Sequence, residues 1–202
     1  MLKGFLHRLP RSMRLLLEIL GIAAGGLLLA LLLNTFAFRF YKVIGPSMQP
    51  TLATNDIVLI NKIGVTSSHL TRTSFIPERG QIVVFRNPLI SEQTNEDFLI
   101  KRVIGLPGER IVIQDTQVTI YNTQYPDGLN PDESLQHTLV LPTAGTLDRT
   151  IPQNEIFVMG DNRVGEYSHD SRNGLSTIRT QDIEGIATMR LFPFTRITLL
   201  QQ

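Results

Sequence analysis

The sequence of 202 residues contains no cysteine. This absence excludes a disulfide framework, a thiolate zinc site and a cysteine nucleophile. An excess of charge of one sign is also lacking, because 19 Lys and Arg residues stand against 18 Asp and Glu residues, for a formal net charge of +1. A nucleic-acid partner normally needs a concentrated basic face, and this balance gives no sign of one. The length favours one modest domain with attachments.

One long apolar run lies near the N-terminus. Positions 15–38 read LLLEILGIAAGGLLLALLLNTFAF, with Glu18 as the one ionisable residue. At about 1.5 Å per residue a helix over these positions spans roughly 36 Å, enough for a bilayer core of about 30 Å. Glu18 lies near one end, where its side chain can reach the interface. We therefore predict a transmembrane anchor at 15–38.

Basic residues flank this run unequally. Those before it are Lys3, Arg8, Arg11 and Arg14, and those after it are Arg39 and Lys42. The imbalance favours a cytoplasmic N-terminus (1–14) and an extracytoplasmic domain (39–202). A cleaved signal peptide has the same order of charges, but its apolar stretch is shorter and ends in small residues. The aromatic and basic end, NTFAFRFYK, favours an uncleaved anchor.

After the predicted anchor the chain consists of short apolar stretches separated by Gly, Pro, Asn and Asp. The stretches are DIVLINKI (56–63), GQIVVFRN (80–87), DFLIKRVIG (97–105), RIVIQDTQVTIYN (110–122), EIFVMGD (155–161), IEGIATMRLF (183–192) and RITLL (196–200). This pattern is typical of an all-β domain with many short strands. We expect 64–80 to be a surface loop, and 123–154 to be a loop excursion or small inserted subdomain. The predicted fold class is mainly β after a single N-terminal transmembrane helix.

A serine lies directly after the predicted anchor, in VIGPSMQPTL (43–52). Ser47 needs a base to react, because an alcohol is a poor nucleophile at neutral pH. Among the histidines, His169 is the one beside other polar groups, in EYSHDSRNG. From the residues alone, a triad of Ser47, His169 and an aspartate stays open.

Lysine is the alternative base. An unperturbed lysine, with a pKa near 10.4, is only about 0.1% neutral near pH 7.4, but burial lowers that pKa by up to 3–5 units. Lys101 in DFLIKRVIG is the lysine hardest to solvate, because on a strand it shares a face with Leu99 and Val103. The same pattern also suits an edge-strand lysine that prevents pairing with other sheets.

A third polar stretch, GDNRVGEYSHDSRNG, occupies 160–174. Such a density of Asn, Asp and Ser is typical of a turn held by its own hydrogen bonds. The same groups could instead supply hydroxyls and ion pairs that hold a base and a nucleophile in place. The stretch therefore has both a structural and a functional interpretation.

Taken in order, these stretches resemble the type I signal peptidases, membrane-anchored serine proteases that remove signal peptides from exported preproteins. GPSMQPTL resembles the nucleophile box S-M-x-P-T-L, and RGQIVVFRNP (79–88) resembles the RGD-I-V-V-F strand. IKRVIGLPGE (100–109) resembles the box K-R-x-x-G-x-P-G-D/E. GDNR and SHDSRNG together resemble the box G-D-N-R-x-x-S-x-D-S-R-x-x-G. The resemblance spans roughly residues 15–192.

This resemblance implies an all-β, signal-peptidase-like catalytic domain with a serine–lysine dyad. Ser47 would be the nucleophile and Lys101 the general base, with His169 at a variable position. Ser168 would hydrogen-bond the lysine amine and orient it. The backbone N–H of Ser47 would donate to the oxyanion of the tetrahedral intermediate.

The resemblance also implies ion pairs, a substrate cleft and partners. Arg102 would pair with Asp161, and Asp170 with Arg172, to brace the site. The residues expected near the cleft are Ile44, Met48, Val83 and Phe85. The implied partners are signal peptides with small residues at the first and third positions before the cut, and the lipid bilayer. No metal or cofactor is implied.

Two positions depart from the family pattern. Gly45 stands where some members have a serine whose hydroxyl helps to bind the oxyanion. Between Arg163 and Ser168 lie four residues, VGEY, where the common pattern has two. If this insertion shifts the register of Ser168, Ser171 is the alternative hydroxyl.

Two other functions compete with a signal peptidase. A self-cleaving, repressor-type serine–lysine protease lacks the anchor and the GDNR box, which argues against it. A catalytically inactive, membrane-tethered β-domain that binds exported peptides would have no need of the two reactive residues. Because Ser47 and Lys101 are both present, the sequence favours the active peptidase.

Overall fold

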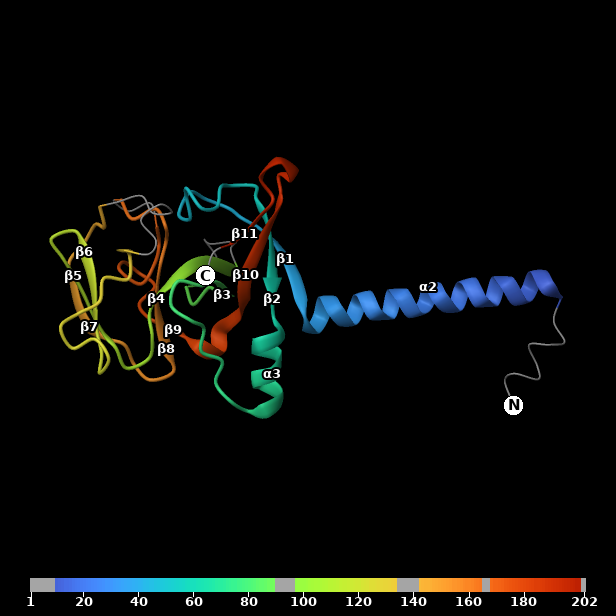
Figure 1. Ribbon diagram of the computed structural model, residues 1–202, viewed down its shortest axis with the longest axis horizontal. Helices are drawn as coiled ribbons and strands as arrows, with labels where there is room; N and C mark the ends of the chain where they lie inside the picture. Colours follow the sequence, from blue (N-terminus) through green and yellow to red (C-terminus); the bar gives the residue numbers. More distant parts are fainter. Residues whose placement is uncertain (1–9, 90–96, 134–141, 165–167, 201–202) are drawn as a thin grey trace.

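The computed structural model describes residues 10–89, 97–133, 142–164 and 168–200. It begins with helix α2 (Arg11–Phe36), which projects as a long rod from the body of the molecule (Figure 1). None of its side chains is buried. Within the described residues, α2 is the one helix long and apolar enough to cross a membrane. It begins earlier than the expected 15–38, because the residues after Pro10 are good helix formers.

The helix joins the body through a single residue. Ala37 separates α2 from strand β1 (Phe38–Lys42). The junction is held from the side, because Lys62 N–H donates to Ala37 O at 2.8 Å and the Thr66 hydroxyl donates to Phe36 O at 2.8 Å. The end of the helix is therefore fixed to the start of helix α3 (Ile63–Thr71).

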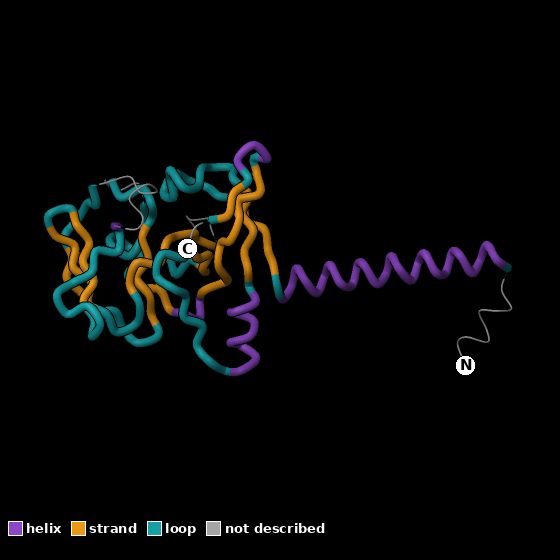
Figure 2. The backbone as a smooth tube through the Cα atoms, in the orientation of Figure 1, coloured by secondary structure: helices purple, strands orange, loops and turns teal. Residues whose placement is uncertain are grey.

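The main sheet has eight strands within the described residues. Its order is β1, β2 (Ile57–Asn61), β10 (Ile183–Phe192), β3 (Ile82–Arg86), β4 (Phe98–Gly105), β8 (Glu155–Met159) and β9 (Ile178–Arg179), with β11 (Thr198–Leu199) paired to β10. All neighbouring strands are antiparallel. Strands account for most of the regular structure beyond α2 (Figure 2), which confirms the predicted fold class.

A second sheet lies at the end of the molecule away from α2 (Figure 1). Its order is β6 (Gln117–Tyr121), β5 (Arg110–Gln114) and β7 (Leu147–Thr150). Asp115 and Thr116 both have positive φ, as a tight two-residue hairpin requires, so the predicted stretch 110–122 is a hairpin. Fully buried side chains join this sheet to β4 and β8; among them are Ile104, Ile111, Ile113, Ile120, Phe157 and Met159.

Each of the seven predicted apolar stretches contains a strand, but three strands and one helix were not predicted. One of these strands is β9 (Ile178–Arg179), which lies between the polar stretch 160–174 and β10. Strand β1 lies in the aromatic and basic segment after the helix, and β7 lies in the excursion 123–154. Helix α3 (Ile63–Thr71) occupies the start of the expected loop 64–80. It buries only Val65 and Ser68, so it has no apolar stripe that a helical period would reveal. Two short 3-10 helices, η2 (Thr180–Asp182) and η3 (Phe194–Arg196), flank β10.

Candidate active site

Ser47 lies in the turn between β1 and β2. The turn is closed by Leu52 N–H, which donates to Met48 O at 2.8 Å, and both of these side chains are fully buried. Gly45 has φ +83°, a conformation that L side chains rarely adopt, so a serine at this position would be strained. The two buried side chains fix the turn, and the serine itself stays half-buried at its surface.

Lys101 lies on β4 and is only 3% exposed. Its Nζ lies 2.9 Å from Ser47 Oγ, at hydrogen-bond distance, and also donates to Ile100 O at 3.0 Å. Apolar burial of an amine disfavours its charged form. An amine held at this distance from a hydroxyl can take the hydroxyl's proton when it is neutral.

The expected pair Arg102 and Asp161 lies next to this contact. Arg102 Nε donates to Asp161 Oδ1 at 2.7 Å and Nη2 donates to Oδ2 at 2.6 Å, while Nη1 donates to Gly80 O at 2.6 Å. Asp161 also accepts a hydrogen bond from the Thr51 hydroxyl. Both charged side chains are buried. The pair therefore ties β4 to the segment after β8 and to the turn that holds Ser47.

The second expected pair, Asp170 and Arg172, is also present. Arg172 donates from Nε at 3.0 Å and from Nη2 at 2.8 Å to the Asp170 carboxylate, which also accepts Gly160 N–H at 3.1 Å. Burial raises the pKa of Asp170, but the hydrogen bonds and charge of Arg172 outweigh it, so the pKa lies below its ordinary value. Asp170 is thus an anion that orders the polar stretch around itself.

Ser168 is fully buried, but the structure differs from expectation in its contacts. The Ser168 hydroxyl lies close enough to Asp170 to help lower the pKa of that carboxyl, yet within the part of the chain that the structure describes no atom stands in hydrogen-bond geometry with Ser168 Oγ. Among the described residues, the expected bond between the lysine amine and Ser168 Oγ is therefore not present, while Lys101 Nζ donates to Ser47 Oγ and Ile100 O. Of the VGEY insertion, positions 165–167 lie outside the described residues. The alternative hydroxyl, Ser171 Oγ, accepts Val158 N–H at 3.0 Å.

A groove of about 440 Å³ opens beside Ser47. Its walls come from β1, the turn before Ser47 and the start of β4; the lining residues are Tyr41, Lys42, Val43, Ile44, Gly45, Pro46, Ser47, Val58, Val84, Asp97, Phe98, Leu99, Ile100, Lys101 and His169. Burial, followed by the negative charge of Glu184, raises the pKa of Tyr41 to about 12. Tyr41 therefore presents a neutral phenol at neutral pH.

Only one of the four expected cleft residues lines this groove. Ile44 does and is 62% exposed. Met48, Val83 and Phe85 are completely buried in the core, and Val84 lines the groove in place of its two neighbours. The structure thus corrects the expectation for these three. Strand β3 is buried on both faces, so its alternation in sequence does not reveal which face meets the groove.

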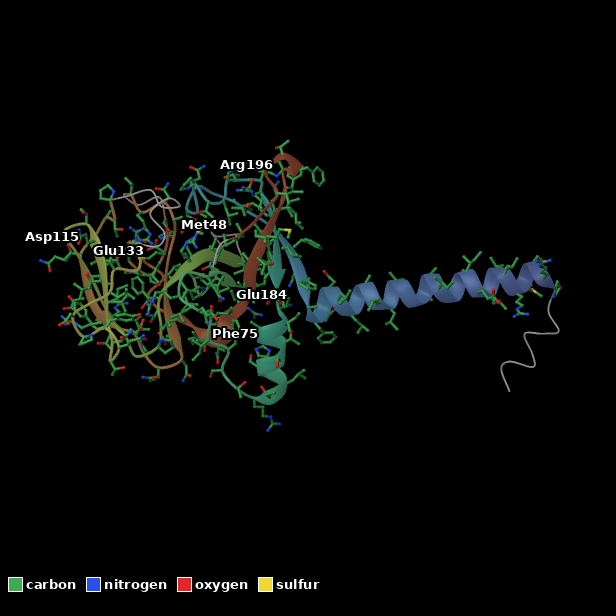
Figure 3. The ribbon with its side chains drawn as sticks, in the orientation of Figure 1. Met48, Phe75, Asp115, Glu133, Glu184 and Arg196 are labelled. Carbon is green, nitrogen blue, oxygen red and sulfur yellow. The ribbon has the colours of Figure 1, made fainter. Side chains whose placement is uncertain are left out.

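Aromatic and charged groups surround Tyr41, at the end of the groove away from Ser47. Tyr41 and Phe98 pack edge to face with ring centroids 5.2 Å apart, and the Arg39 guanidinium lies over both rings. Glu184 accepts from Arg39 at 3.2 Å and pairs with Lys62 at 2.7 Å. Figure 3 labels Glu184 near the base of the long helix. The groove therefore extends from β1, the strand that follows α2, toward Ser47.

His169 does not take the place of the base. In the described part of the chain, the amine of Lys101 lies at hydrogen-bond distance from Ser47 Oγ, whereas His169 is exposed with Nδ1 3.4 Å from Asn173 O. The histidine lines the groove without joining this contact. Among the residues that the structure describes, no cluster of His, Asp and Glu could hold a metal ion.

Among the charged pairs that sequence reasoning did not predict, one involves the GDNR stretch. Nη1 and Nη2 of Arg163 donate to the two carboxylate oxygens of Asp132 at 2.8 Å each. Arg163 belongs to the GDNR stretch, so the sequence shows a charged side chain that needs a partner. The partner lies in the excursion 123–154, and nothing in the spacing points to it.

A serine hydroxyl beside a buried amine, at the end of an open groove, is typical of a serine hydrolase with an amine as its base. Comparison with known proteins gives the family. The model of the family "Signal peptidase, peptidase S26" matches residues 16–192. The chain therefore belongs to the signal peptidase family S26, and it is a serine endopeptidase of the signal peptidase I type.

Two relatives from Bacillus subtilis agree with this assignment. The chain is 32% identical over 176 residues to signal peptidase I P of Bacillus subtilis subsp. natto, covering 85% of this chain and 86% of that one. It is 33% identical over 174 residues to signal peptidase I T of Bacillus subtilis (strain 168), covering 84% and 82%. A crystal structure of a signal peptidase I from Enterococcus faecalis V583 is 27% identical, with a TM-score of 0.42, and covers 55% of this chain and 97% of that one.

Proposed function

We propose that this protein is a membrane-anchored endopeptidase that removes signal peptides from exported preproteins, with Ser47 as nucleophile and Lys101 as general base. The observation that supports this most directly is the 2.9 Å contact between Lys101 Nζ and Ser47 Oγ, made by a lysine that is almost wholly buried. Family membership supports the substrate class.

The mechanism follows from this contact. Neutral Lys101 takes the hydroxyl proton as Ser47 Oγ attacks the scissile carbonyl, which forms a tetrahedral intermediate. The lysinium then protonates the leaving amine, and the C–N bond breaks to leave an acyl-enzyme. A water molecule, deprotonated by the same amine, hydrolyses the ester and restores the serine. The backbone N–H of Ser47 is the proposed oxyanion donor, because Gly45 supplies no hydroxyl.

Ser168 and the two predicted ion pairs support the dyad in this proposal. The Asp161 pair braces the nucleophile turn against β4, and the Asp170 pair holds Gly160. Ser168 Oγ is buried beside Gly160, and no group among the described residues stands in hydrogen-bond geometry with it, so it is able to accept a hydrogen bond from the lysine amine as charge develops there. Hydrogen bonds of this kind often tighten only when substrate is bound.

The groove suits an extended peptide. β1 ends the main sheet, and β8 pairs with β4 only from Arg102 onward, so two strand edges flank the groove among the described residues. An extended substrate can add its backbone to such an edge while alternate side chains enter the walls. The walls include the apolar side chains of Val58, Val84 and Ile100, which suit small apolar side chains of a substrate. This supports a preference for small residues at the first and third positions before the cut.

The helix α2 supports a membrane anchor. Its 26 residues correspond to roughly 39 Å, and large apolar side chains are exposed along its length. Such a surface is stable in lipid and not in water. Arg14 Nε binds Glu18 at 3.1 Å, which neutralises the one acid of the apolar run. The basic residues before the apolar run 15–38 favour a cytoplasmic N-terminus and an extracytoplasmic catalytic domain.

The experiment that tests this proposal is cleavage of a fluorogenic preprotein peptide with an Ala-x-Ala site in detergent–lipid micelles. We expect Ser47→Ala and Lys101→Ala to be inactive while His169→Ala stays close to wild type, since the histidine lies outside the dyad. Between about pH 6 and pH 10 the rate should rise as Lys101 loses its proton. Activity in Lys101→Ala together with loss of activity in His169→Ala would contradict the assignment of Lys101 as the base. A wild type that binds the peptide without cutting it would indicate a tethered peptide-binding domain instead.

A further inference from the structure

Asp132 lies between β6 and β7, outside the four stretches that resemble the family. Its own turn is fixed locally, because Asp132 N–H donates to Asn130 Oδ1 at 3.0 Å. Its two carboxylate oxygens accept from Nη1 and Nη2 of Arg163 at 2.8 Å each. The Arg163 side chain is 0% exposed and that of Asp132 is 8% exposed. A carboxylate from the excursion thus reaches the buried end of the GDNR segment.

The guanidinium that Asp132 holds is bonded to this segment by its third nitrogen. Arg163 Nε donates to Gly160 O at 2.8 Å. Nη1 also donates to Thr143 Oγ1 at 3.3 Å, and the carbonyl of Arg163 accepts Ala144 N–H at 3.1 Å. Because the guanidinium group is planar and rigid, the direction of its Nε–H bond is fixed once Nη1 and Nη2 are bound. Asp132 therefore determines where the guanidinium holds the Gly160 carbonyl.

The same segment contacts the nucleophile. Asn162 N–H donates to Ser47 O at 3.0 Å. A methyl group placed on Gly160 would lie 2.4 Å from Ser47 O and 2.4 Å from Ser168 Oγ, so this backbone packs directly on both serines. A displacement of the segment would therefore move the Ser47 backbone.

We infer that Asp132 is a positioning residue for Ser47, acting through Arg163 and the segment 160–163. This inference rests on the proposed function. The bidentate pair orients the guanidinium, the guanidinium holds Gly160 O, and the backbone of the segment holds Ser47 O, which sets Oγ at 2.9 Å from Lys101 Nζ. A misplacement of about 1 Å in reacting groups can reduce a rate about 100-fold.

A purely structural role for the pair makes a different prediction. Asp132 could serve only to neutralise a buried guanidinium, since an unpaired buried charge is strongly destabilising. In that case an apolar residue in place of the guanidinium would remove the need for the carboxylate. If Asp132 instead positions the segment through Arg163, an apolar residue at 163 still lacks the hydrogen bond to Gly160 O, and the segment stays out of position.

The test therefore uses a single and a double variant of the full chain in micelles. Asp132→Asn keeps the shape of the side chain and removes its charge. Asp132→Asn/Arg163→Met removes both charges and fills a similar volume. Asp148→Asn is the matched control, because Asp148 binds Arg110 bidentately on the second sheet with side chains 53% and 56% exposed. For each protein, kcat and KM for the preprotein peptide and the thermal midpoint are measured.

We expect Asp132→Asn to lower kcat by about 10- to 100-fold. Its KM should stay within about twofold, because the groove is untouched. The double variant should regain the thermal midpoint but not kcat, and Asp148→Asn should match wild type in all three quantities. If Asp132→Asn fails to fold, the double variant alone decides.

Two results would overturn the inference while leaving the proposed function intact. One is a wild-type kcat in Asp132→Asn. The other is recovery of kcat together with the thermal midpoint in the double variant, which would make Asp132 a charge balance only. A wild-type protein that does not cleave the peptide would remove the proposed function first, and the inference with it.

Discussion

The two sheets of this protein contain ion pairs of almost the same geometry in opposite surroundings. On the main sheet, Arg102 and Asp161 are 2.6 Å apart with side chains 2% and 0% exposed. On the second sheet, Arg110 and Asp148 are also 2.6 Å apart, but both side chains are more than half exposed. A buried pair constrains its neighbours because water cannot replace either partner, whereas an exposed pair contributes little. The difference indicates that the buried ion pair near Ser47 contributes by fixing the positions of the groups around it.

The largest effect is expected from breaking the buried pair. Asp161→Asn leaves the Arg102 guanidinium buried without its counter-ion and weakens the bond from Thr51. The loss in free energy of unfolding should be about 3–5 kcal/mol. Denaturant unfolding in micelles measures it. A loss similar to that in Asp148→Asn would show that burial does not distinguish the two sheets.

A smaller effect on stability, with a large one on activity, is expected from Gly160→Ala. The added methyl group would meet Ser47 O and Ser168 Oγ at 2.4 Å, and the former is backbone. Overpacking of this kind costs about 1–3 kcal/mol, and the shift of Ser47 should lower kcat. Gly21→Ala is the control, since nothing lies within 4 Å of a methyl group there. Equal kcat in the two variants would contradict the close packing of this segment.

Acid should affect the two sheets differently. The pKa values of Asp170 and Asp148 are both below ordinary, Asp170 through Arg172 against its burial, and Asp148 through Arg110. A carboxyl with a depressed pKa in the folded state stabilises the fold above its ordinary pKa, near 4, and this contribution is lost as pH falls through the folded-state value. Added salt should screen the exposed pair and not the buried one. The thermal midpoint of wild type and Asp148→Asn against pH, at low and high salt, tests this. An acid limb that disappears in salt would contradict it.

The smallest effect is expected on the second sheet. Asp148→Asn removes the partner of Arg110, but water solvates the freed guanidinium, which still lies 5.5 Å from the ring centre of Tyr121. The thermal midpoint and kcat should be indistinguishable from wild type. A measurable decrease in kcat would mean that the second sheet influences the active site through more than Asp132.

The sequence predicted the parts of this structure that depend on local pattern. The apolar helix, the seven strand-containing stretches and the closeness of Ser47 and Lys101 each have a short, contiguous signal or a family motif. What it did not reveal depends on contacts made across the fold. The pair of Asp132 and Arg163 spans 31 positions and joins the segment between β6 and β7 to the segment after β8. Val84 rather than Val83 faces the groove because β3 is buried on both sides, and no alternation marks the difference.

The single residue between α2 and β1 has a consequence for where cutting occurs. Because the connection is one residue long, it allows little movement between α2 and β1. The carbonyl groups of Phe36 and Ala37 both accept hydrogen bonds from the segment that begins α3. With α2 in the bilayer as proposed, the groove starts at a set height above the lipid and Ser47 lies a fixed number of residues further on. The distance from the membrane then helps to select the bond that is cut, together with the side chains beside that bond.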